Sequence, residues 1–320
     1  MMTASALTSN PSPAKEKFCD PDVTARGERR AKVALKVLDT LWFNTGTLCN
    51  LACLNCYIES SPRNDRLAYL TRAEVARYLD EIARGRLPTR LIGFTGGEPF
   101  MNPDMIGMLE DTLARGFDAL VLTNAMRPMQ KVQPRLLDLR QRFGARLTVR
   151  VSLDHYEPAV HEAERGARIW QPTVDGLVWL AREGFEVHVA ARLLSLEAEG
   201  EVRAGFARLF AGIGIGLDAS DPVRLMLFPE MDAAQDVPEI TEACWVILGR
   251  SPDEVMCSGS RMVVKRRGAS SPAVVACTLL PYDMRFELGA TLAEANRPVA
   301  LNHPHCASFC VLGGAACSRA

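Results

Sequence analysis

Three cysteines lie close together near the start of the chain, in the run Cys49-Asn-Leu-Ala-Cys53-Leu-Asn-Cys56. Thiolates at such short spacing are typical ligands of iron–sulfur clusters, and three of them leave one iron of a cubane open to a further ligand. A zinc loop or a set of buried thiols would use the same residues. Zinc sites prefer four ligands, however, and this loop has three and no nearby histidine. The spacing favours an iron–sulfur cluster.

A second pattern, Thr95-Gly-Gly-Glu-Pro99, follows the next strand-like segment. Adjacent glycines let the backbone approach a ligand closely, and Glu98 offers a carboxylate to an ammonium group. By itself such a stretch is most often a turn. Because it lies one strand–helix unit after the cysteine loop, we expect both patterns at the same end of a sheet.

The elements that must position these residues alternate between strand-like and helix-like segments. Thr71-Arg-Ala-Glu74 is a capping box and Asn102-Pro103 opens a further helix. Later strand centres recur roughly every 27 to 39 residues, the length of βα units. This predicts an α/β fold with a partial, TIM-like (β/α)6 barrel and active groups at the carboxyl ends of its strands. A doubly wound open sheet is the competing architecture. The six strand candidates are residues 37–43, 91–94, 117–122, 147–153, 185–193 and 223–228.

Composition sets the class of protein. Hydrophobic residues make up 48% and charged residues 23% of the 320, as in soluble globular chains. The net charge of −1 argues against a nucleic-acid or anionic membrane surface. We find neither a secretory signal nor an apolar run of about 20 residues, so we expect a cytoplasmic protein whose ten cysteines serve metal and not disulfides. We expect a disordered lead-in over 1–34, the barrel over 35–235 and a small cysteine-rich α+β module over 236–320.

Together the motifs resemble the radical S-adenosylmethionine (SAM) superfamily. They are the three cysteines with Tyr57 beside the last, Gly96-Gly-Glu-Pro99, Leu122-Thr-Asn124 and Val151-Ser-Leu-Asp154. The resemblance covers about residues 36–230. It implies a cluster whose open iron chelates SAM and, once reduced, cleaves it to a 5′-deoxyadenosyl radical that takes a hydrogen atom from substrate.

The resemblance also implies a role for each matching residue. Cys49, Cys53 and Cys56 would be cluster ligands, and Gly96, Gly97 and Glu98 would meet the SAM amino group. Thr123, Asn124, Ser152 and Asp154 would lie along the ribose and carboxylate, with Arg165 or Arg168 and Arg192 pairing the carboxylate. The chain departs from the family where Ala-Met follows Asn124 and where His155 follows Asp154, positions at which many members have glycine. His155 is therefore a candidate acid–base group that projects into the cavity, and an ordinary polar loop residue is the alternative.

The last fifth of the chain resembles the twitch and SPASM extensions of the same superfamily, which bind auxiliary [4Fe–4S] clusters. Segments 262–265 and 273–277 form a predicted hairpin with a cysteine near each end, and a cysteine-rich tail follows. The five cysteines suit one fully ligated cluster, held by Cys257, Cys277, Cys306 and either Cys310 or Cys317. A zinc site that also uses His303 or His305 is the alternative. Cys244 and Cys19 are expected to be bystanders.

We thus expect a radical SAM enzyme that carries out a net oxidation or rearrangement of a peptide or small molecule. The auxiliary cluster would accept the substrate electron or position the substrate, and a flavodoxin or ferredoxin would supply electrons. We find no separate N-terminal domain for a leader peptide, which favours a small substrate or a partner protein that presents the peptide. The alternatives are methyl or methylthio transfer and a non-catalytic zinc or iron–sulfur scaffold. A scaffold would not need Glu98, Asn124 and Ser152 at strand ends.

Overall fold

The computed structural model describes residues 16–194, 197–230 and 234–314. Its main sheet contains six parallel strands that lie side by side in chain order. This sequential order is that of a partial (β/α)6 barrel, whereas a doubly wound sheet would reverse its order partway. The predicted fold class is confirmed, and every predicted strand segment overlaps one of these strands. They are β2 (Thr40–Asn44), β3 (Leu91–Thr95), β4 (Asp118–Thr123), β5 (Leu147–Ser152), β6 (Glu186–Leu193) and β7 (Leu225–Pro229).

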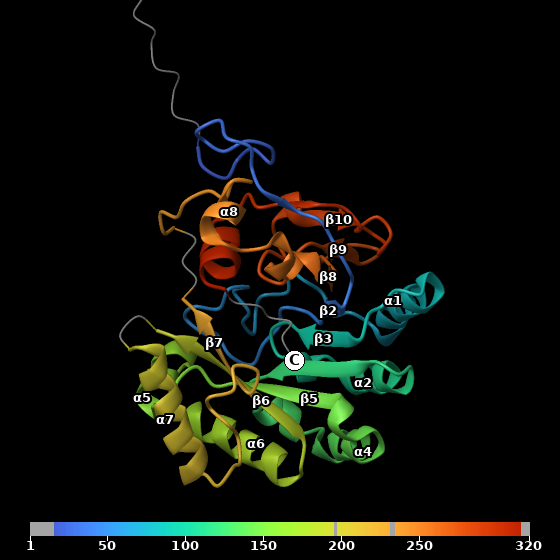
Figure 1. Ribbon diagram of the computed structural model, residues 1–320. Coiled ribbons are helices and arrows are strands. Elements are labelled where there is room, and N and C mark those ends of the chain that lie inside the picture. Colours follow the sequence, from blue (N-terminus) through green and yellow to red (C-terminus); the bar gives the residue numbers. More distant parts are fainter. Residues whose placement is uncertain (1–15, 195–196, 231–233, 315–320) are drawn as a thin grey trace, which may run out of the picture.

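Helices connect successive strands and cover the outer face of the barrel (Figure 1). The first begins at the predicted capping box, in which the Thr71 hydroxyl accepts a hydrogen bond from the Glu74 N–H at 3.2 Å and the Glu74 carboxylate accepts one from the Thr71 N–H at 2.9 Å. None of the helices in the described ranges has the length and apolar character needed to cross a bilayer. The helices are α1 (Arg72–Gly85), α2 (Met105–Ala114), α3 (Arg127–Gln130), α4 (Gln133–Phe143), α5 (Pro158–Arg165), α6 (Trp170–Arg182) and α7 (Glu199–Gly212).

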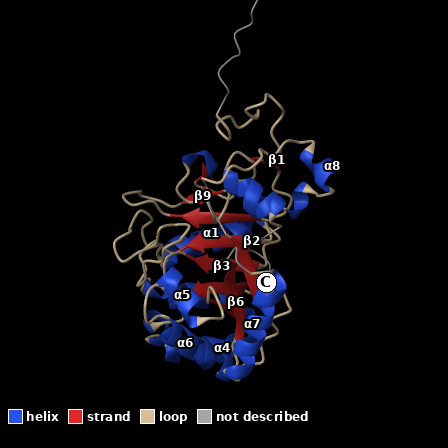
Figure 2. Cartoon of the chain, turned by 90° about the vertical axis from the view of Figure 1, so that its left-hand side faces the viewer, coloured by secondary structure: helices blue, strands red, loops and turns tan. Residues whose placement is uncertain are grey.

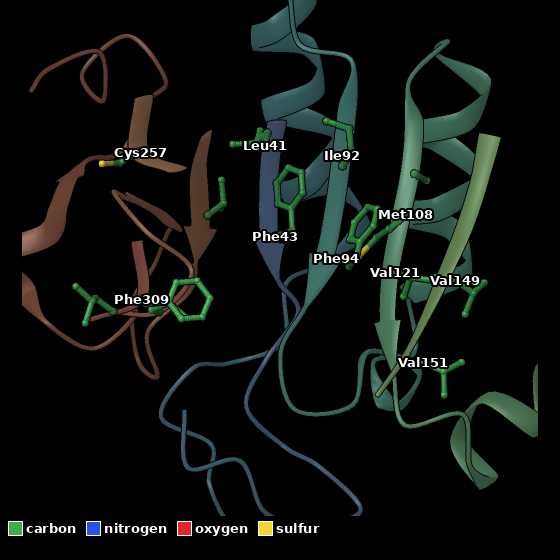
Figure 3. Close-up of a cluster of buried hydrophobic side chains, with 14 of the residues drawn as sticks. Leu41, Phe43, Ile92, Phe94, Met108, Val121, Val149, Val151, Cys257 and Phe309 are labelled. Carbon is green, nitrogen blue, oxygen red and sulfur yellow. The ribbon is translucent and has the colours of Figure 1, made fainter. Parts of the chain in front are cut away.

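Residues along the strands alternate between two apolar layers. Leu41 and Phe43 of β2 belong to the large core between sheet and helices, where Phe43 stacks on Phe94 of β3 with ring centroids 5.7 Å apart (Figure 3). Trp42 belongs to a smaller cluster with Leu120 of β4. The strands are therefore buried on both faces, as parallel strands usually are.

The C-terminal segment extends the barrel sheet. β8 (Ser260–Val264) pairs in parallel with β2, β9 (Ala273–Val275) pairs antiparallel with β8, and β10 (Glu287–Gly289) pairs antiparallel with β9. The predicted hairpin is confirmed, but its docking against β2 had no signal in the sequence. The domain boundary at 235/236 stays a prediction. The remaining elements are α8 (Cys244–Leu248), β11 (Val299–Ala300), a π-helix (Cys306–Leu312), and 3-10 turns at Pro99–Met101, Gly144–Arg146, Pro252–Glu254, Met256–Ser258 and Met284–Phe286.

Residues 16–34 are packed, in contrast to the disordered lead-in that we predict for 1–34. β1 (Lys32–Val33) pairs antiparallel with β11, and the chain before it runs over the C-terminal module (Figures 1 and 2). Phe18 is buried, and the fully buried Arg30 donates to the Glu239 carboxylate at 2.5 Å. These contacts are with residues more than 200 positions away, so local composition did not reveal them. Residues 1–15 lie outside the described part of the chain.

Candidate active site

The cysteine loop leaves the carboxyl end of β2 and lies against the glycine pair that follows β3. The Gly97 N–H donates to the Gly46 carbonyl at 2.8 Å. A Cβ at Gly97 would lie 2.3 Å from the Leu48 carbonyl oxygen. At Gly96, where φ is +144°, a Cβ would lie 2.5 Å from the Gly46 carbonyl oxygen. Both positions require glycine, because a side chain would push the cysteine loop away from the strand end.

One large cavity opens at the carboxyl ends of the strands, and we call it the three-thiol cavity because Cys49, Cys53 and Cys56 all line it. The cavity has a volume of about 200 Å³. The other predicted site residues that line it are Tyr57, Gly96, Gly97, Thr123, Asn124, Ser152, Asp154, Arg165 and Arg192. The fold thus brings nearly all of the residues predicted to bind the first cluster and SAM to one cavity.

Glu98 lies behind the wall of this cavity. Its Oε1 accepts hydrogen bonds from the Thr123 hydroxyl (2.9 Å) and the Phe100 N–H (3.1 Å), and its Oε2 accepts one from the Asn124 N–H (2.9 Å). Burial raises the pKa of Glu98 to about 7, although these donors act to lower it. The carboxylate therefore fixes the end of β4 in position. Its expected direct contact with an ammonium group stays a prediction.

Two arginine–carboxylate pairs line the cavity opposite β3. Arg165 donates from Nε and Nη2 to the two carboxylate oxygens of Asp154, both at 2.8 Å. Burial acts to raise the pKa of Asp154, but the charge and hydrogen bonds of Arg165 outweigh it and hold the pKa below its usual value. Arg192 donates from Nη1 to one carboxylate oxygen of Glu164. Each of these two arginines can therefore donate to a bound anion only from the N–H groups that its carboxylate partner does not accept.

The same wall anchors the cysteine loop. The Glu164 carbonyl accepts the Leu54 N–H at 2.8 Å, and its carboxylate accepts the Asn55 side-chain amide at 3.0 Å. On the other side, the Asn124 amide donates to Oδ1 of Asn50 at 2.9 Å. Glu164, Asn50 and Asn55 were missed in the sequence, as was the buried Arg150 on β5, which also lines the cavity. No spacing signal marks them, since their contacts join segments far apart in the chain.

The three thiols suit a cluster in their chemistry. The Cys49 sulfur accepts the Leu51 N–H at 3.4 Å and the Cys56 sulfur accepts the Ser60 N–H at 3.3 Å. Burial raises the pKa of Cys49 to about 12, so only metal binding would deprotonate it near neutral pH. N–H donors to sulfur are among the features that tune cluster-bound thiolates. Three such sulfurs facing one cavity fit three corners of a cubane whose fourth corner faces the open space.

The prediction that His155 projects into the cavity is wrong. Its Nδ1 accepts the Glu157 N–H at 3.0 Å, and its Nε2 lies 3.4 Å from the Glu197 carboxylate. The ring stacks on Tyr156 with centroids 4.2 Å apart. The turn after β5 uses the imidazole as an acceptor for its own backbone, which directs the ring away from the cavity. Arg168, the alternative to Arg165, is exposed.

A second, smaller cavity lies in the C-terminal module, and we call it the four-thiol site because Cys257, Cys277, Cys306 and Cys310 line it. This cavity has a volume of about 20 Å³. These are the predicted cysteines with Cys310 as the fourth, while Cys317 falls beyond the described residues. Cys244 instead accepts the Thr241 N–H at 3.4 Å, and Cys19 is exposed.

The walls of the four-thiol site are mostly apolar, with His305 as a further neighbour. Burial raises the pKa of Cys257 to about 11 and that of Cys306 to about 12. The Cys277 sulfur accepts the Leu279 N–H at 3.3 Å. Within the described ranges, no three histidine, cysteine or acidic side chains converge tightly enough to hold one metal ion. Four thiols match the corners of a cubane in number. Leu279 also lines the three-thiol cavity, so the two sites are neighbours.

Comparison with known proteins gives a consistent picture. The family model described as "Radical SAM superfamily" matches residues 43–201. The chain is 30% identical over 143 residues to the antilisterial bacteriocin subtilosin biosynthesis protein AlbA of Bacillus subtilis, a stretch that covers 44% of this chain and 30% of AlbA. It is 29% identical over 137 residues to the mycofactocin maturase MftC of Mycobacterium ulcerans, covering 43% of this chain and 35% of MftC. The matched stretches span about a third of these relatives.

Solved structures share the fold. The crystal structure of Streptococcus suis SuiB bound to its precursor peptide SuiA has a TM-score of 0.59 at 12% identity, over 80% of this chain and 63% of SuiB. The structure of anSMEcpe with bound SAM has a TM-score of 0.57 at 14% identity, over 80% of this chain and 79% of that protein. At these identities the likeness concerns the fold alone.

Proposed function

This chain belongs to the radical SAM superfamily, and on that premise we propose that it reductively cleaves SAM in the three-thiol cavity and removes a hydrogen atom from a substrate bound there. The observation that carries the proposal is that three thiols of one loop and the polar ends of β3, β4 and β5 line the same cavity. A scaffold would have no use for such convergence.

Cys49, Cys53 and Cys56 would hold the catalytic [4Fe–4S] cluster. When bound, that cluster supplies the electron that cleaves SAM to methionine and a 5′-deoxyadenosyl radical, and an external donor such as a flavodoxin or ferredoxin would replace the electron. The chain's own task is to bind and orient SAM. The Gly96–Gly97 backbone, Thr123, Asn124 and Ser152 would contact it, and Arg165, held by Asp154, would face its carboxylate.

The remaining walls would serve the substrate. Trp42, Phe228 and Phe309 line the cavity away from the cysteine loop, and Phe228 stacks on Phe309 with centroids 5.7 Å apart. Apolar walls exclude water, which would protect a reactive radical. Phe309 comes from the C-terminal module, so that module would form part of the substrate site.

The four-thiol site would hold an auxiliary [4Fe–4S] cluster with no open iron, because four cysteines are available to it. Its place beside Leu279, next to the substrate region, suits it to take up the electron left on the substrate after hydrogen-atom removal. The net reaction would then be an oxidation.

For the substrate we propose a peptide. AlbA is a bacteriocin biosynthesis protein, and SuiB has been crystallised with a precursor peptide. A small molecule is the alternative outcome of a substrate test that compares a peptide library with sugars and amino acids.

Anaerobic reconstitution tests the proposal. We expect about eight irons per chain and the appearance of 5′-deoxyadenosine when SAM and dithionite are added. The triple variant Cys49→Ala/Cys53→Ala/Cys56→Ala should retain about four irons and make no 5′-deoxyadenosine. A fully loaded wild type that does not cleave SAM would overturn the catalytic proposal.

A further inference from the structure

Arg261 is a buried cation beside the four-thiol site. It lies on β8, four residues after Cys257, and is 1% exposed. Its guanidinium donates only to backbone carbonyls, those of Cys257 (2.6 Å), Ser260 (2.8 Å), Ala295 (3.1 Å) and Arg297 (3.1 Å). These hydrogen bonds satisfy its donors and fix its position, but they do not neutralise its charge.

Other arginines in this module or packed against it have carboxylate partners. Arg30, also fully buried, lies 2.5 Å from the Glu239 carboxylate, and Arg285 lies 2.6 Å from that of Asp283. Across the described ranges, no acidic side chain lies within ion-pair distance of Arg261. A buried charge without a counter-charge is strongly unfavourable. The position therefore calls for an anion that the folded chain by itself does not supply.

Arg261 directly contacts one of the four cysteines of this site, because its Nη1 donates to the Cys257 carbonyl at 2.6 Å. Metal binding would deprotonate the cysteines. Four thiolates outweigh the positive charge of an iron–sulfur core, so the filled site is an anion.

We propose that Arg261 is the counter-charge of the auxiliary cluster held by Cys257, Cys277, Cys306 and Cys310, and that it raises the reduction potential of that cluster. Reduction adds one electron to an assembly that is already negative, and a fixed cation nearby favours the more negative state. Arg261 is thus a positioning residue that makes the four-thiol site a better electron acceptor. This inference rests on the auxiliary cluster proposed above.

The test uses the Cys49→Ala/Cys53→Ala/Cys56→Ala chain, in which only the auxiliary cluster can form. Iron content is measured first, and a redox titration followed by electron paramagnetic resonance then gives the midpoint potential. In Arg261→Met we expect the ratio of reduced to oxidised cluster at a fixed potential to fall at least tenfold, which is 59 mV for a one-electron couple. Arg261→Lys keeps the charge and should stay within about threefold of the parent.

The double variant Arg30→Met/Glu239→Gln is the matched control. It removes a buried arginine that packs against the same module, together with its carboxylate, so the net charge near the cluster does not change, and we expect the parental potential. Should Arg261→Met fail to fold, Arg261→Gln removes the charge while keeping amide donors, and the same tenfold change is expected.

The outcomes separate the two proposals. A parent chain without iron would overturn the auxiliary cluster itself. About four irons per chain together with an unchanged potential in the neutral Arg261 variants would overturn the role of Arg261 and leave the cluster standing. Equal shifts in the lysine and methionine variants would show a role in structure and not in charge.

Discussion

The two cysteine sites are built for different tasks. The three-thiol cavity is about 200 Å³ and combines one short loop with polar strand ends, whereas the four-thiol site is about 20 Å³ and has mostly apolar walls. The first site would leave space for a ligand beside the proposed catalytic cluster, and the second would enclose the proposed auxiliary cluster with four thiols. The difference between an open and a closed coordination shell is the usual difference between a catalytic and a structural or electron-transfer centre.

The sites also differ in whether carboxylates neutralise the positive charges of their arginines. Arg165 and Arg192 of the three-thiol cavity are paired with Asp154 and Glu164, so that cavity is held together without its cofactors. Within the described ranges Arg261 donates to backbone carbonyls and pairs with no carboxylate, so by our proposal the auxiliary cluster would supply the missing negative charge. A preformed cavity suits a ligand that enters and leaves, and a site completed by its metal suits a permanent one.

Removing one cysteine from either site should give the largest effect, because each loss should affect only the cluster of that site. Cys53→Ala should abolish formation of 5′-deoxyadenosine, because it removes a corner of the open cluster. Cys306→Ala should lose about four irons but retain SAM cleavage, since the open cluster is untouched. Iron analysis and mass spectrometry of 5′-deoxyadenosine check both. If Cys306→Ala kept all its iron, the four-thiol site would not be a metal site.

The next prediction identifies the fourth ligand of the four-thiol site. Cys310→Ser should lower the iron bound in the Cys49/Cys53/Cys56-free chain severalfold, because Cys310 lines the four-thiol site. Cys317→Ser serves as the paired variant and should keep that iron. The reverse result would assign Cys317 as the ligand.

A side chain at Gly97 should impair the three-thiol cavity and leave the four-thiol site intact. In Gly97→Ala the new Cβ would lie 2.3 Å from the Leu48 carbonyl oxygen, which would displace the cysteine loop. We expect loss of most SAM cleavage with the auxiliary iron intact. Gly200→Ala is the control, since a Cβ there meets nothing within 4 Å, and it should keep full activity. Normal SAM cleavage by Gly97→Ala would contradict the tight approach of the loop.

Weakening one preformed ion pair should have a moderate effect. Asp154→Asn leaves Arg165 without its counter-charge and loosens the guanidinium that faces SAM. Hydrogen bonds between charged groups contribute about 1.5 to 3 kcal/mol, so we expect the Kd for SAM to rise about 10- to 100-fold. Isothermal titration calorimetry on the loaded protein measures this. Asp111→Asn, which breaks the exposed pair with Arg72, should leave the Kd unchanged.

Acid should destabilise the folded chain through a buried histidine next to the three-thiol cavity. The buried His161 accepts the Asp154 N–H at Nδ1 (3.1 Å), and burial, aided by the charge of Arg165, lowers its pKa from 6.5 to about 4. Between pH 6.5 and 4 the unfolded chain therefore binds a proton that the folded chain does not, so stability falls as the pH falls. The loss is on the order of 2 to 3 kcal/mol. Denaturant unfolding against pH should show it in the wild type, and a His161→Gln variant with the same pH dependence would contradict it.

The sequence was informative wherever ligands are close together in the chain. Cys49, Cys53 and Cys56 lie on one loop, so their spacing alone indicated a cluster, and the strand pattern placed the glycine pair at the same end of the sheet. It was misleading at His155, because a side chain next to a site residue can turn toward its own backbone, as its hydrogen bond with the Glu157 N–H shows. Glu98 was singled out as a functional residue, but which atoms it contacts could not be predicted.

Residue types and short spacings by themselves pointed to the family, to the strand segments and to Cys49, Cys53 and Cys56 as proposed ligands, since these follow from local geometry and from periodicity along the chain. Only the tertiary structure decided the sequential order of the strands, which carboxylates neutralise Arg165 and Arg192, that β8 joins the barrel beside β2, and that Cys257 and Cys310, 53 positions apart in the chain, line one cavity. The physical reason is that charge pairing and thiol convergence depend on packing between distant segments. No local pattern encodes that packing, which also leaves Arg261 bonded to backbone carbonyls and without a carboxylate partner among the described residues.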